Sequence, residues 1–287
     1  MSILKNKNIL QTGFWQELAP TLHVGDKKFL ESQTIWNIDD SSIEVLRELI
    51  RVEGYFQLPP QQWCLPINEM AEAVARMDSK NLPLPFVFVY DEYWCLFVRM
   101  HKILIGVLGE GYLRRPDFWT WMINPHKNES GWRPHRDNTY ETLFANGMPK
   151  TLTVWLPLTD ATPLNGCMYI VPADRDPTYG TPEETQWRYS HADVRALPAE
   201  AGSLFIWNQA VLHWGSHSSS RALGPRISVA FEFQSGDVPP YNQPLSEPLK
   251  IPSLQGRLQL IAKQILQYKH MYPLSTENEL LAKALLK

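Results

Sequence analysis

The second half of the chain, from Pro116 onward, is a series of short β-branched and aromatic segments separated by turn-forming residues. The segments are FWTWMIN, TLTVWLPL, CMYIVP, SLFIW and RISVAFEF, with Pro, Gly and Asn clustered between them. Short strands at this spacing, without helical segments between them, are typical of an antiparallel sandwich or jelly roll rather than of parallel βαβ units. The sequence therefore predicts a mainly β core over residues 116–235.

Helical periodicity precedes and follows this β region. Apolar residues recur at helical spacing in SSIEVLRELIRVEGY, after Asp39 and Asp40 as candidate N-caps and before Gly54 as a terminator. Further helices are expected in INEMAEAVARM and, as one long buried helix, within EYWCLFVRMHKILIGVL. A last helix in LQGRLQLIAKQILQYKHMY could pack on the core or form a dimerisation face.

No internal repeat, low-complexity tract or Gly/Ser-rich linker divides the chain, so a single domain over residues 1–287 is expected. The expected fold class is α+β, mainly β with flanking helices. Its parts are an N-terminal helical part (1–115), the jelly-roll core (116–235) and a C-terminal extension with a helix (236–287). Within the core, the polar and turn-rich stretch 173–198 is long enough to be a lid over a site.

Charge and composition limit the partners that this chain can have. The formal net charge of −3 gives no support for a nucleic-acid or anionic-membrane partner. No apolar run approaches the roughly 20 residues that span a bilayer, and the N-terminus lacks a secretory signal pattern. Three scattered cysteines suggest no disulfide framework, so we expect a cytoplasmic protein. A small-molecule partner is expected, and both a monomer and a homodimer remain open.

The segment PHRDNTY, residues 134–140, carries the most specific chemistry. In a β-strand, residues two apart point to the same face, so His135 and Asp137 would project together. They would supply two ligands of a 2-His-1-carboxylate site, which holds Fe(II) on one face and leaves positions open for oxygen and a cosubstrate. His213, after a strand-like run, is the preferred third ligand, and His217 is its rival. For an isolated HxD pattern, a surface His–Asp pair is the alternative.

A second set of polar residues occurs in RISVAFEF, where Arg226 and Ser228 share one face of the expected strand. An Arg in a buried interior needs an anionic partner, because an unpaired buried charge costs several kcal/mol. A guanidinium that grips a carboxylate in bidentate fashion, with a hydroxyl beside it, suits a dicarboxylic 2-oxo acid. An internal Asp or Glu is the alternative partner. Ser216 is the second choice for the hydroxyl, and Arg221 is a weaker rival for the cation.

The strand expected in TLTVWLPL has a polar and aromatic face. Thr151, Thr153 and Trp155 share this face, opposite the three aliphatic residues of the strand. Such a face suits a cofactor cavity, although it also describes a solvent-facing strand. Its place directly after the HRD motif favours the cavity, with Thr153 and Trp155 next to the cofactor.

In this order, HRD, TVWLPLTDATPLNGCMYIVP, GSLFIWNQAVLHWGS and PRISVAFEF resemble the phytanoyl-CoA dioxygenase family of Fe(II)/2-oxoglutarate oxygenases. The resemblance covers roughly residues 40–235 and implies a double-stranded β-helix with flanking helices. It implies that His135, Asp137 and His213 ligate iron. It also implies that Arg226 binds the distal carboxylate of 2-oxoglutarate, with Trp155 beside it. One departure is the connection from His213 to Arg226, which is slightly longer than is usual in the family.

The resemblance also implies a reaction. With O2, an enzyme of this kind oxidises an unactivated C–H bond, by hydroxylation, desaturation, ring closure or dealkylation. Related halogenases have a small residue in place of the carboxylate ligand, so Asp137 argues against halogenation. The family name describes an acyl-CoA substrate, but no basic cluster here clearly demands a nucleotide diphosphate. We therefore expect a natural product or another small metabolite.

Polar residues near the HRD motif are candidates for substrate contacts at the pocket mouth. The candidates beside the motif are Arg133, Arg136, Asn138 and Tyr140. In the 173–198 lid they are Trp187, Arg188 and His191. Polar loop residues are mostly solvated, so we expect no more than half of the first group to contact a substrate.

Two other classes of protein compete with this interpretation. A cupin-type metalloenzyme that needs no 2-oxoglutarate would usually carry an HxH pattern, which this chain lacks. A catalytically silent binding protein of the same fold would usually have lost a metal ligand or the anchoring Arg. All four candidate residues are present here, so an oxygenase is the favoured reading.

Overall fold

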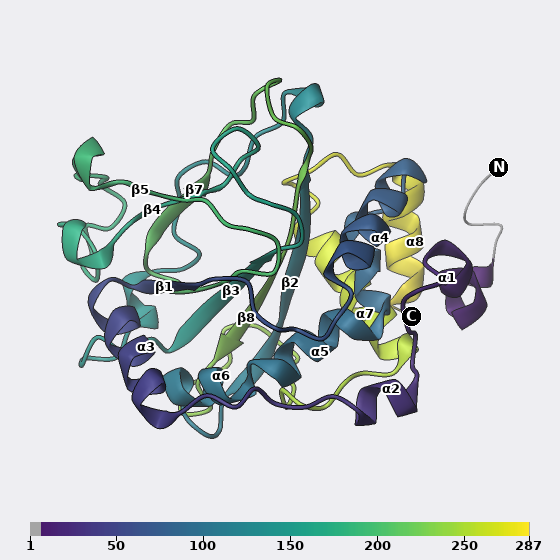
Figure 1. The fold of residues 1–287 in the computed structure, drawn as a ribbon, viewed down its shortest axis with the longest axis horizontal. Helices are drawn as coiled ribbons and strands as arrows, with labels where there is room; N and C mark the ends of the chain where they lie inside the picture. The colour runs from purple at the N-terminus through teal and green to yellow at the C-terminus, as the bar shows by residue number, and fades with distance from the viewer. Residues whose placement is uncertain (1–6, 287) are drawn as a thin grey trace.

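The computed structural model describes residues 7–286. Within them, the larger sheet has the order β1-β6-β3-β8-β2 and the smaller sheet the order β5-β4-β7, and all pairings are antiparallel (Figure 1). The strands are β1 (Tyr55–Leu58), β2 (Leu113–Ile123), β3 (Thr151–Pro157), β4 (Met168–Val171), β5 (Arg195–Leu197), β6 (Leu204–Asn208), β7 (Leu212–Gly215) and β8 (Arg226–Gln234). The two sheets form a jelly-roll core, as the sequence predicts.

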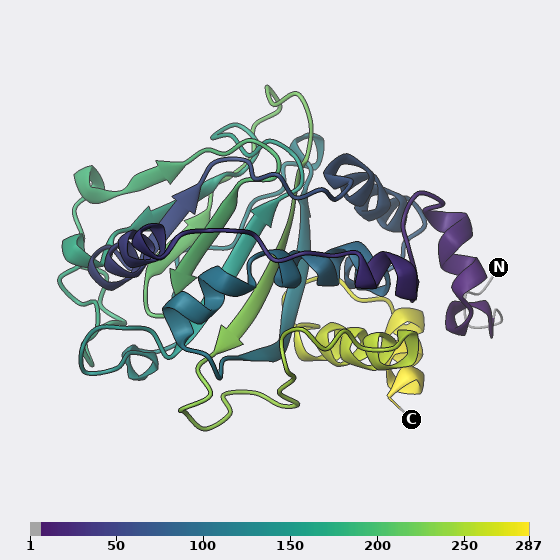
Figure 2. The ribbon, with the colours of Figure 1, turned by 60° about the horizontal axis from the view of Figure 1, so that its bottom comes forward.

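Helices flank this core, so the α+β fold class is confirmed. The helices are α1 (Thr12–Leu18), α2 (Lys27–Glu31), α3 (Asp40–Val52), α4 (Ile67–Ser79), α5 (Asp91–Arg99), α6 (His101–Leu108), α7 (Leu254–Gln267) and α8 (Thr276–Leu285). In Figures 1 and 2 the helices α1, α4, α7 and α8 gather beyond β2, while β4, β5 and β7 lie on the opposite side of the molecule.

The two faces of the larger sheet have different neighbours. On β3, Leu152, Val154 and Leu156 are fully buried in the apolar cluster that the helices share. Trp155, which points the other way, packs with residues of the smaller sheet instead. This alternation follows from the two-residue period of a strand, and it turns the polar and aromatic face of β3 toward the space between the sheets.

Several helices agree with the sequence prediction. The side chain of Asp39 caps α3 by accepting a hydrogen bond from the Ser42 amide. Gly54, which follows α3, has a φ of +80°, a conformation that a side chain would strain. The predicted C-terminal helix is α7, and its apolar face packs into the core, where Ile261 and Ile265 are fully buried.

Other elements differ from the sequence prediction. The single long helix expected within EYWCLFVRMHKILIGVL is wrong, because the chain breaks at Met100 into α5 and α6. The short helices α1, α2 and α8 were not foreseen, nor was β1, which pairs with β6. The strand β2 begins before Pro116, and its pairing with β8 is irregular between Arg114 and Phe118. An edge strand with such an irregularity tolerates a proline.

No helix in the described part of the chain has both the length and the apolarity that crossing a membrane requires.

Candidate active site

The HRD motif lies in the connection between β2 and β3 and not in a strand, so that local prediction is wrong. His135 nevertheless forms an isolated antiparallel bridge with His213 of β7. The amide of each residue donates to the carbonyl of the other, at 3.0 and 2.9 Å. This bridge holds the loop in an extended conformation at His135, where the candidate metal ligands begin.

Two glycines permit this close approach. A Cβ atom on Gly131 would lie 2.4 Å from the Cα of Gly215, a distance that real Cβ atoms do not reach. The two backbones therefore touch where the loop and β7 run together, next to the His135–His213 bridge. Glycine is required at such a contact because it alone lacks a side chain.

The side chains of His135, Asp137 and His213 converge. Their candidate ligand atoms all lie within 4.8 Å of one another. The Oδ1 atom of Asp137 is 3.4 Å from Nε2 of His135 and 3.5 Å from Nε2 of His213. His213 is buried, whereas the other two residues are half-buried. His217, the rival ligand, is exposed and lies outside this group.

Each of the three candidate metal ligands is oriented by hydrogen bonds to its other polar side-chain atom. Nδ1 of His135 lies 2.7 Å from the Arg133 carbonyl, and Nδ1 of His213 lies 3.1 Å from the Val211 carbonyl. Because a carbonyl can only accept, each Nδ1 carries the proton and each Nε2 presents a lone pair.

The Asp137 carboxylate is oriented in the same way. Its Oδ2 accepts from Thr153 Oγ1 at 2.6 Å and from Trp207 Nε1 at 2.9 Å. Its Oδ1 is left facing the two imidazoles. Two imidazole nitrogens and one carboxylate oxygen on a common face are the donor set of a non-haem Fe(II) site with open positions.

The protonation states also suit metal binding. Burial lowers the pKa of His213 to about 4, so this imidazole is neutral at pH 7. Burial acts in the same direction on His135, but the Asp137 carboxylate outweighs it and raises the pKa of His135. Burial alone would raise the pKa of Asp137, but the two imidazoles and Thr153 hold it well below its usual range. The carboxylate is therefore ionised at neutral pH.

Arg226 is a buried cation that the protein leaves incompletely paired. It is 2% exposed, and its Nη1 donates to Ser228 Oγ at 2.7 Å, while its Nε has no hydrogen-bond partner. Burial lowers the pKa of Arg226 to about 10, so it is still charged at pH 7. Among the described residues, no Asp or Glu forms an ion pair with it, which disfavours the internal partner considered above. The arrangement fits an external anion.

The surroundings of Arg226 agree with that fit. Its Cζ lies 5.5 Å from the centre of the Trp155 ring, and both residues line a cavity of about 220 Å³ that also contains His135, Asp137 and His213. Ser228, and not Ser216, is the hydroxyl that contacts Arg226. The rival cation Arg221 is exposed.

Of the four residues proposed beside the motif, only Arg136 lines this cavity. Its guanidinium is already occupied, because it pairs with Asp176 at 2.6 Å and donates to Thr178 Oγ1 at 3.2 Å. The structure places Arg133 on the surface. The amide of Asn138 donates to the Gln209 carbonyl, and that of Tyr140 to the Glu184 carboxylate.

The segment 173–198 does not line the cavity, so the structure does not support its expected role as a lid. Trp187 is half exposed, and Arg188 pairs with Glu183. The segment instead supports the HRD loop from outside through Asp176 and Glu184. A polar, turn-rich composition marks an irregular segment but does not say which way it faces.

Aromatic residues that the sequence analysis missed form one wall of the cavity. Trp119 and Trp121 of β2, Trp132 of the following loop and Tyr268 after α7 all line it. The signal in the sequence was the WTW spacing, because Trp119 and Trp121, two apart in a strand, must share a face. The contribution of Tyr268 had no sequence signal.

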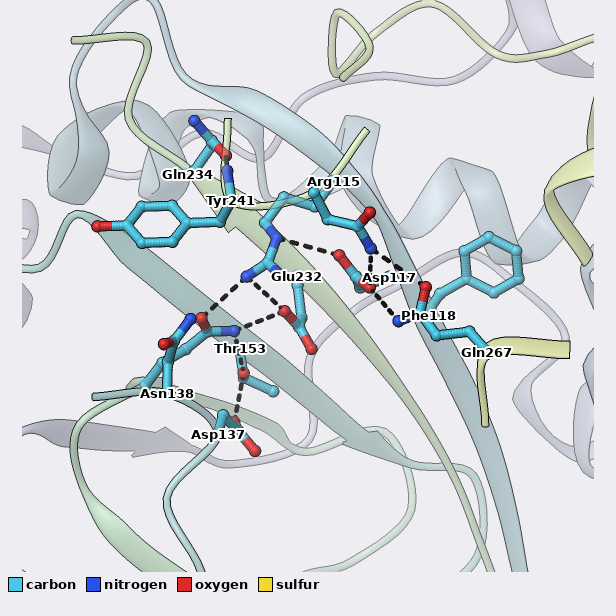
Figure 3. Close-up of polar contacts among 12 residues, drawn as sticks. Arg115, Asp117, Phe118, Asp137, Asn138, Thr153, Glu232, Gln234, Tyr241 and Gln267 are labelled. Carbon is cyan, nitrogen blue, oxygen red and sulfur yellow. Dashed lines mark hydrogen bonds and ion pairs between the residues drawn. The ribbon is translucent and has the colours of Figure 1, made fainter. Parts of the chain in front are cut away.

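A buried ionic cluster was also missed. Arg115 pairs with Glu232 at 2.7 Å and with Asp117 at 3.1 Å (Figure 3). The Gln209 amide joins this cluster to the candidate metal ligands, since it donates to Glu232 at 2.7 Å and to Thr153, the donor to Asp137, at 3.2 Å. Asp117 and Glu232 line the cavity.

Solved structures with a similar fold share little sequence with this chain. The epimerase SnoN from nogalamycin biosynthesis, described as non-haem and α-ketoglutarate-dependent, aligns with a TM-score of 0.53 and 18% identity, over 75% of this chain and 93% of its own. The non-haem monooxygenase ThoJ with nickel aligns with a TM-score of 0.56 and 14% identity, over 78% and 97%. EctD from S. alaskensis, solved with 2-oxoglutarate and 5-hydroxyectoine, gives 0.51 and 12%, over 77% and 92%. At these identities the likeness concerns the fold.

The sequence itself identifies the family. A comparison with curated proteins found no match. The family profile named phytanoyl-CoA dioxygenase matches residues 47–227, which is more than half of the chain. The chain therefore belongs to the phytanoyl-CoA dioxygenase family of non-haem Fe(II)/2-oxoglutarate-dependent oxygenases.

Proposed function

We propose that His135, Asp137 and His213 bind one Fe(II) and that the protein oxidises an unactivated C–H bond of a small metabolite. The observation that carries this proposal is that Nε2 of both histidines and Oδ1 of Asp137 converge, while the second polar atom of each side chain is held by hydrogen bonds. Each Nδ1 donates to a carbonyl, and Oδ2 of Asp137 accepts two hydrogen bonds. The three remaining atoms face one another, all within 4.8 Å.

We further propose that Arg226 binds the distal carboxylate of 2-oxoglutarate. The support is a buried and charged guanidinium, with a free Nε, in the same cavity as the three candidate ligands. A carboxylate at this position would accept charge-assisted hydrogen bonds from Arg226 and would neutralise its buried charge. Ser228 positions the guanidinium, and Trp155 packs near it.

When bound, Fe(II) and 2-oxoglutarate supply the oxidising power that an unactivated C–H bond requires. The protein itself positions the reacting groups and excludes water. Backbone carbonyls fix the orientation of the two imidazoles, and Thr153 and Trp207 hold the Asp137 carboxylate. Trp119, Trp121 and Trp132 line the cavity in which the substrate would bind. Because Tyr268 and Met271 also line the cavity, residues 1–287 would work as one oxygenase domain.

The reaction type and the location in the cell belong to the same proposal. The similar structures include one described as an epimerase and one described as a monooxygenase, and EctD was solved with 2-oxoglutarate and 5-hydroxyectoine. One fold can therefore support different reactions. We assign this chain to oxidation of a natural product or a related small metabolite. All three cysteines are free thiols, which supports a reducing compartment such as the cytoplasm.

The test is an anaerobic titration of the metal-free protein with Fe(II) and then with 2-oxoglutarate. We expect a visible charge-transfer absorption band that appears only after both have been added. His213→Ala should abolish the band. The matched control is His217→Ala, which removes an exposed imidazole four residues away and should leave the band unchanged.

Other outcomes would point elsewhere. Tight Fe(II) binding without any effect of 2-oxoglutarate would favour a cupin-type metalloenzyme. A folded protein that binds neither compound would favour a silent binding protein. Either result would overturn the proposed function.

A further inference from the structure

The cavity has a cationic end and an acidic end. Along β8 the residues that face the space between the sheets are Arg226, Ser228, Ala230 and Glu232, and all but Ser228 line the cavity. Six residues of strand separate Arg226 from Glu232, which corresponds to about 20 Å. Glu232 is paired in register with Thr153, the residue that donates to Asp137. The acidic end therefore lies on the side of the metal ligands that is remote from Arg226.

The acidic end holds two carboxylates but one cation. Two carboxylates, Asp117 and Glu232, share one guanidinium, that of Arg115. Both carboxylates line the cavity, whereas Arg115 does not. Asp117 also accepts from the neutral amides of Asn242 and Gln267. Burial raises the pKa of Glu232 to about 8, and the neighbouring Asp117 carboxylate adds to this rise. A cation placed beside Glu232 would stabilise its ionised form, so this end of the cavity favours a positively charged ligand over a negatively charged one.

Glu232 has an oxygen available for a ligand. Its Oε2 accepts from both Arg115 and Gln209, each at 2.7 Å. Its Oε1 makes no hydrogen bond or ion pair with any described residue. The side chain is 20% exposed, and that exposure is into the cavity it lines.

Electron-rich rings extend from this end along the cavity, since Trp119 pairs in register with Ala230 and Trp121 with Ser228. Trp119 contacts Trp121, with ring centres 5.9 Å apart, and Tyr268, at 5.2 Å. Trp121 in turn contacts Trp132 edge-on at 5.1 Å. The rings thus form one continuous wall, which we call the aromatic wall. Aromatic faces combined with a carboxylate are the chemistry that recognises alkylammonium groups, because both stabilise a positive charge that has left water.

A neighbouring cavity also lacks basic residues. A second, larger cavity of about 880 Å³ shares Trp119, Trp121 and Met271 with the first. Asp78 and Glu129 are the charged residues that line it, and no Lys or Arg does so. Lys127 pairs with Asp78, which leaves Glu129 without a cation. This surface disfavours an anionic ligand such as an acyl-CoA and admits a cation.

We propose that Glu232 and the aromatic wall bind a cationic nitrogen, so that the substrate is a small molecule carrying an alkylammonium group. This inference rests on the proposed oxygenase function and names the substrate class for the same site. In the geometry of the cavity, Arg226 takes the carboxylate of the cosubstrate and Glu232 takes the ammonium group of the substrate. The candidate metal ligands lie between the two.

The test compares two probes of equal shape and different charge. Choline carries a trimethylammonium group, and 3,3-dimethylbutan-1-ol is its uncharged carbon counterpart. Binding to the protein loaded with Fe(II) and 2-oxoglutarate, without oxygen, is followed by quenching of tryptophan fluorescence and by calorimetry. We expect choline to bind at least tenfold more tightly than the alcohol.

The variant Glu232→Gln should lower the affinity for choline at least tenfold and leave that for the alcohol unchanged. The glutamine retains an oxygen that can accept from Arg115, which favours folding. The control is Glu200→Gln, which removes an exposed carboxylate and the same charge. Trp119→Leu removes the β2 tryptophan that is nearer in register to Glu232. It is a second variant, and it should weaken choline binding more than alcohol binding.

The visible band formed with 2-oxoglutarate reports whether each protein is folded and loaded. If the band is intact but the two probes bind equally, or neither binds at 50 mM, the inference is overturned and the proposed function stands. An intact band in Glu232→Gln with choline affinity within threefold of wild type overturns it too. Absence of the band in the wild type would instead count against the proposed function.

Discussion

Replacing Arg226 with methionine separates the role of this residue in binding from its effect on folding. The side chain is 2% exposed and makes one side-chain hydrogen bond, to Ser228. Removing one partner of a buried, hydrogen-bonded charge pair costs about 2–5 kcal/mol. At roughly 1.4 kcal/mol for each factor of ten, the dissociation constant for 2-oxoglutarate should rise by at least about 30-fold.

The stability of the protein without ligand should respond differently. Burial lowers the pKa of Arg226 to about 10, which implies that its charge opposes folding by up to about 3 kcal/mol. Methionine removes this cost and leaves the Ser228 hydroxyl without its donor, a loss of about 1–3 kcal/mol. The free energy of unfolding without ligand should therefore not fall, although a fully buried side chain has been replaced.

Urea unfolding with Fe(II) and without oxygen measures both effects in one assay. Added 2-oxoglutarate should stabilise the wild type, because a ligand that binds the folded state shifts the equilibrium by mass action. It should not stabilise Arg226→Met at the same concentration. Arg221→Met, which alters an exposed Arg in the preceding connection, is the control. A variant that binds 2-oxoglutarate within threefold of wild type would refute the assignment, and a large loss of stability without ligand would mark Arg226 as structural.

Three further predictions concern the metal site. Thr153→Val removes one of two donors to Asp137 Oδ2 and should weaken Fe(II) binding about tenfold in a competition titration, whereas Thr151→Val, whose hydroxyl has no partner, should leave it unchanged. Fe(II) affinity should fall as the pH drops through the raised pKa of His135, because protons then compete for Nε2. Calorimetry in two buffers should show proton release on binding, and none at pH 6 would contradict this. Gly131→Ala places a Cβ 2.4 Å from Gly215 Cα and should lower both the melting temperature and the Fe(II) affinity, while Gly224→Ala, with open space around it, should alter neither.

The sequence alone determined the fold class and the identity of the candidate ligands. Two-residue periodicity specifies which face of β3 and β8 is apolar, because every second side chain must point the same way. It placed Thr153, Trp155 and Arg226 toward the interior space between the sheets, where the structure has them. The HRD motif suggested metal ligands in a similar way, since few residue types bind iron.

Local sequence was less informative about boundaries and loops. The break at Met100 and the short strand β1 depend on packing against partners distant in the chain. The HRD motif is not part of a strand, yet its side chains converge, because the bridge to His213 and the contact between Gly131 and Gly215 replace the missing strand pairing. A periodicity argument could not distinguish these two ways of holding a segment extended.

Only the tertiary structure decided what surrounds the candidate metal ligands. The pairing of Arg136 with Asp176 and the cluster of Arg115 with Glu232 join residues that are 40 and 117 positions apart, and no local pattern encodes such distances. Tyr268 reaches the cavity because α7 packs against the β2 side of the core. The sequence determines which groups can carry the chemistry, since that is a property of residue types. The choice of substrate depends on which groups meet across the cavity, and that is set by packing.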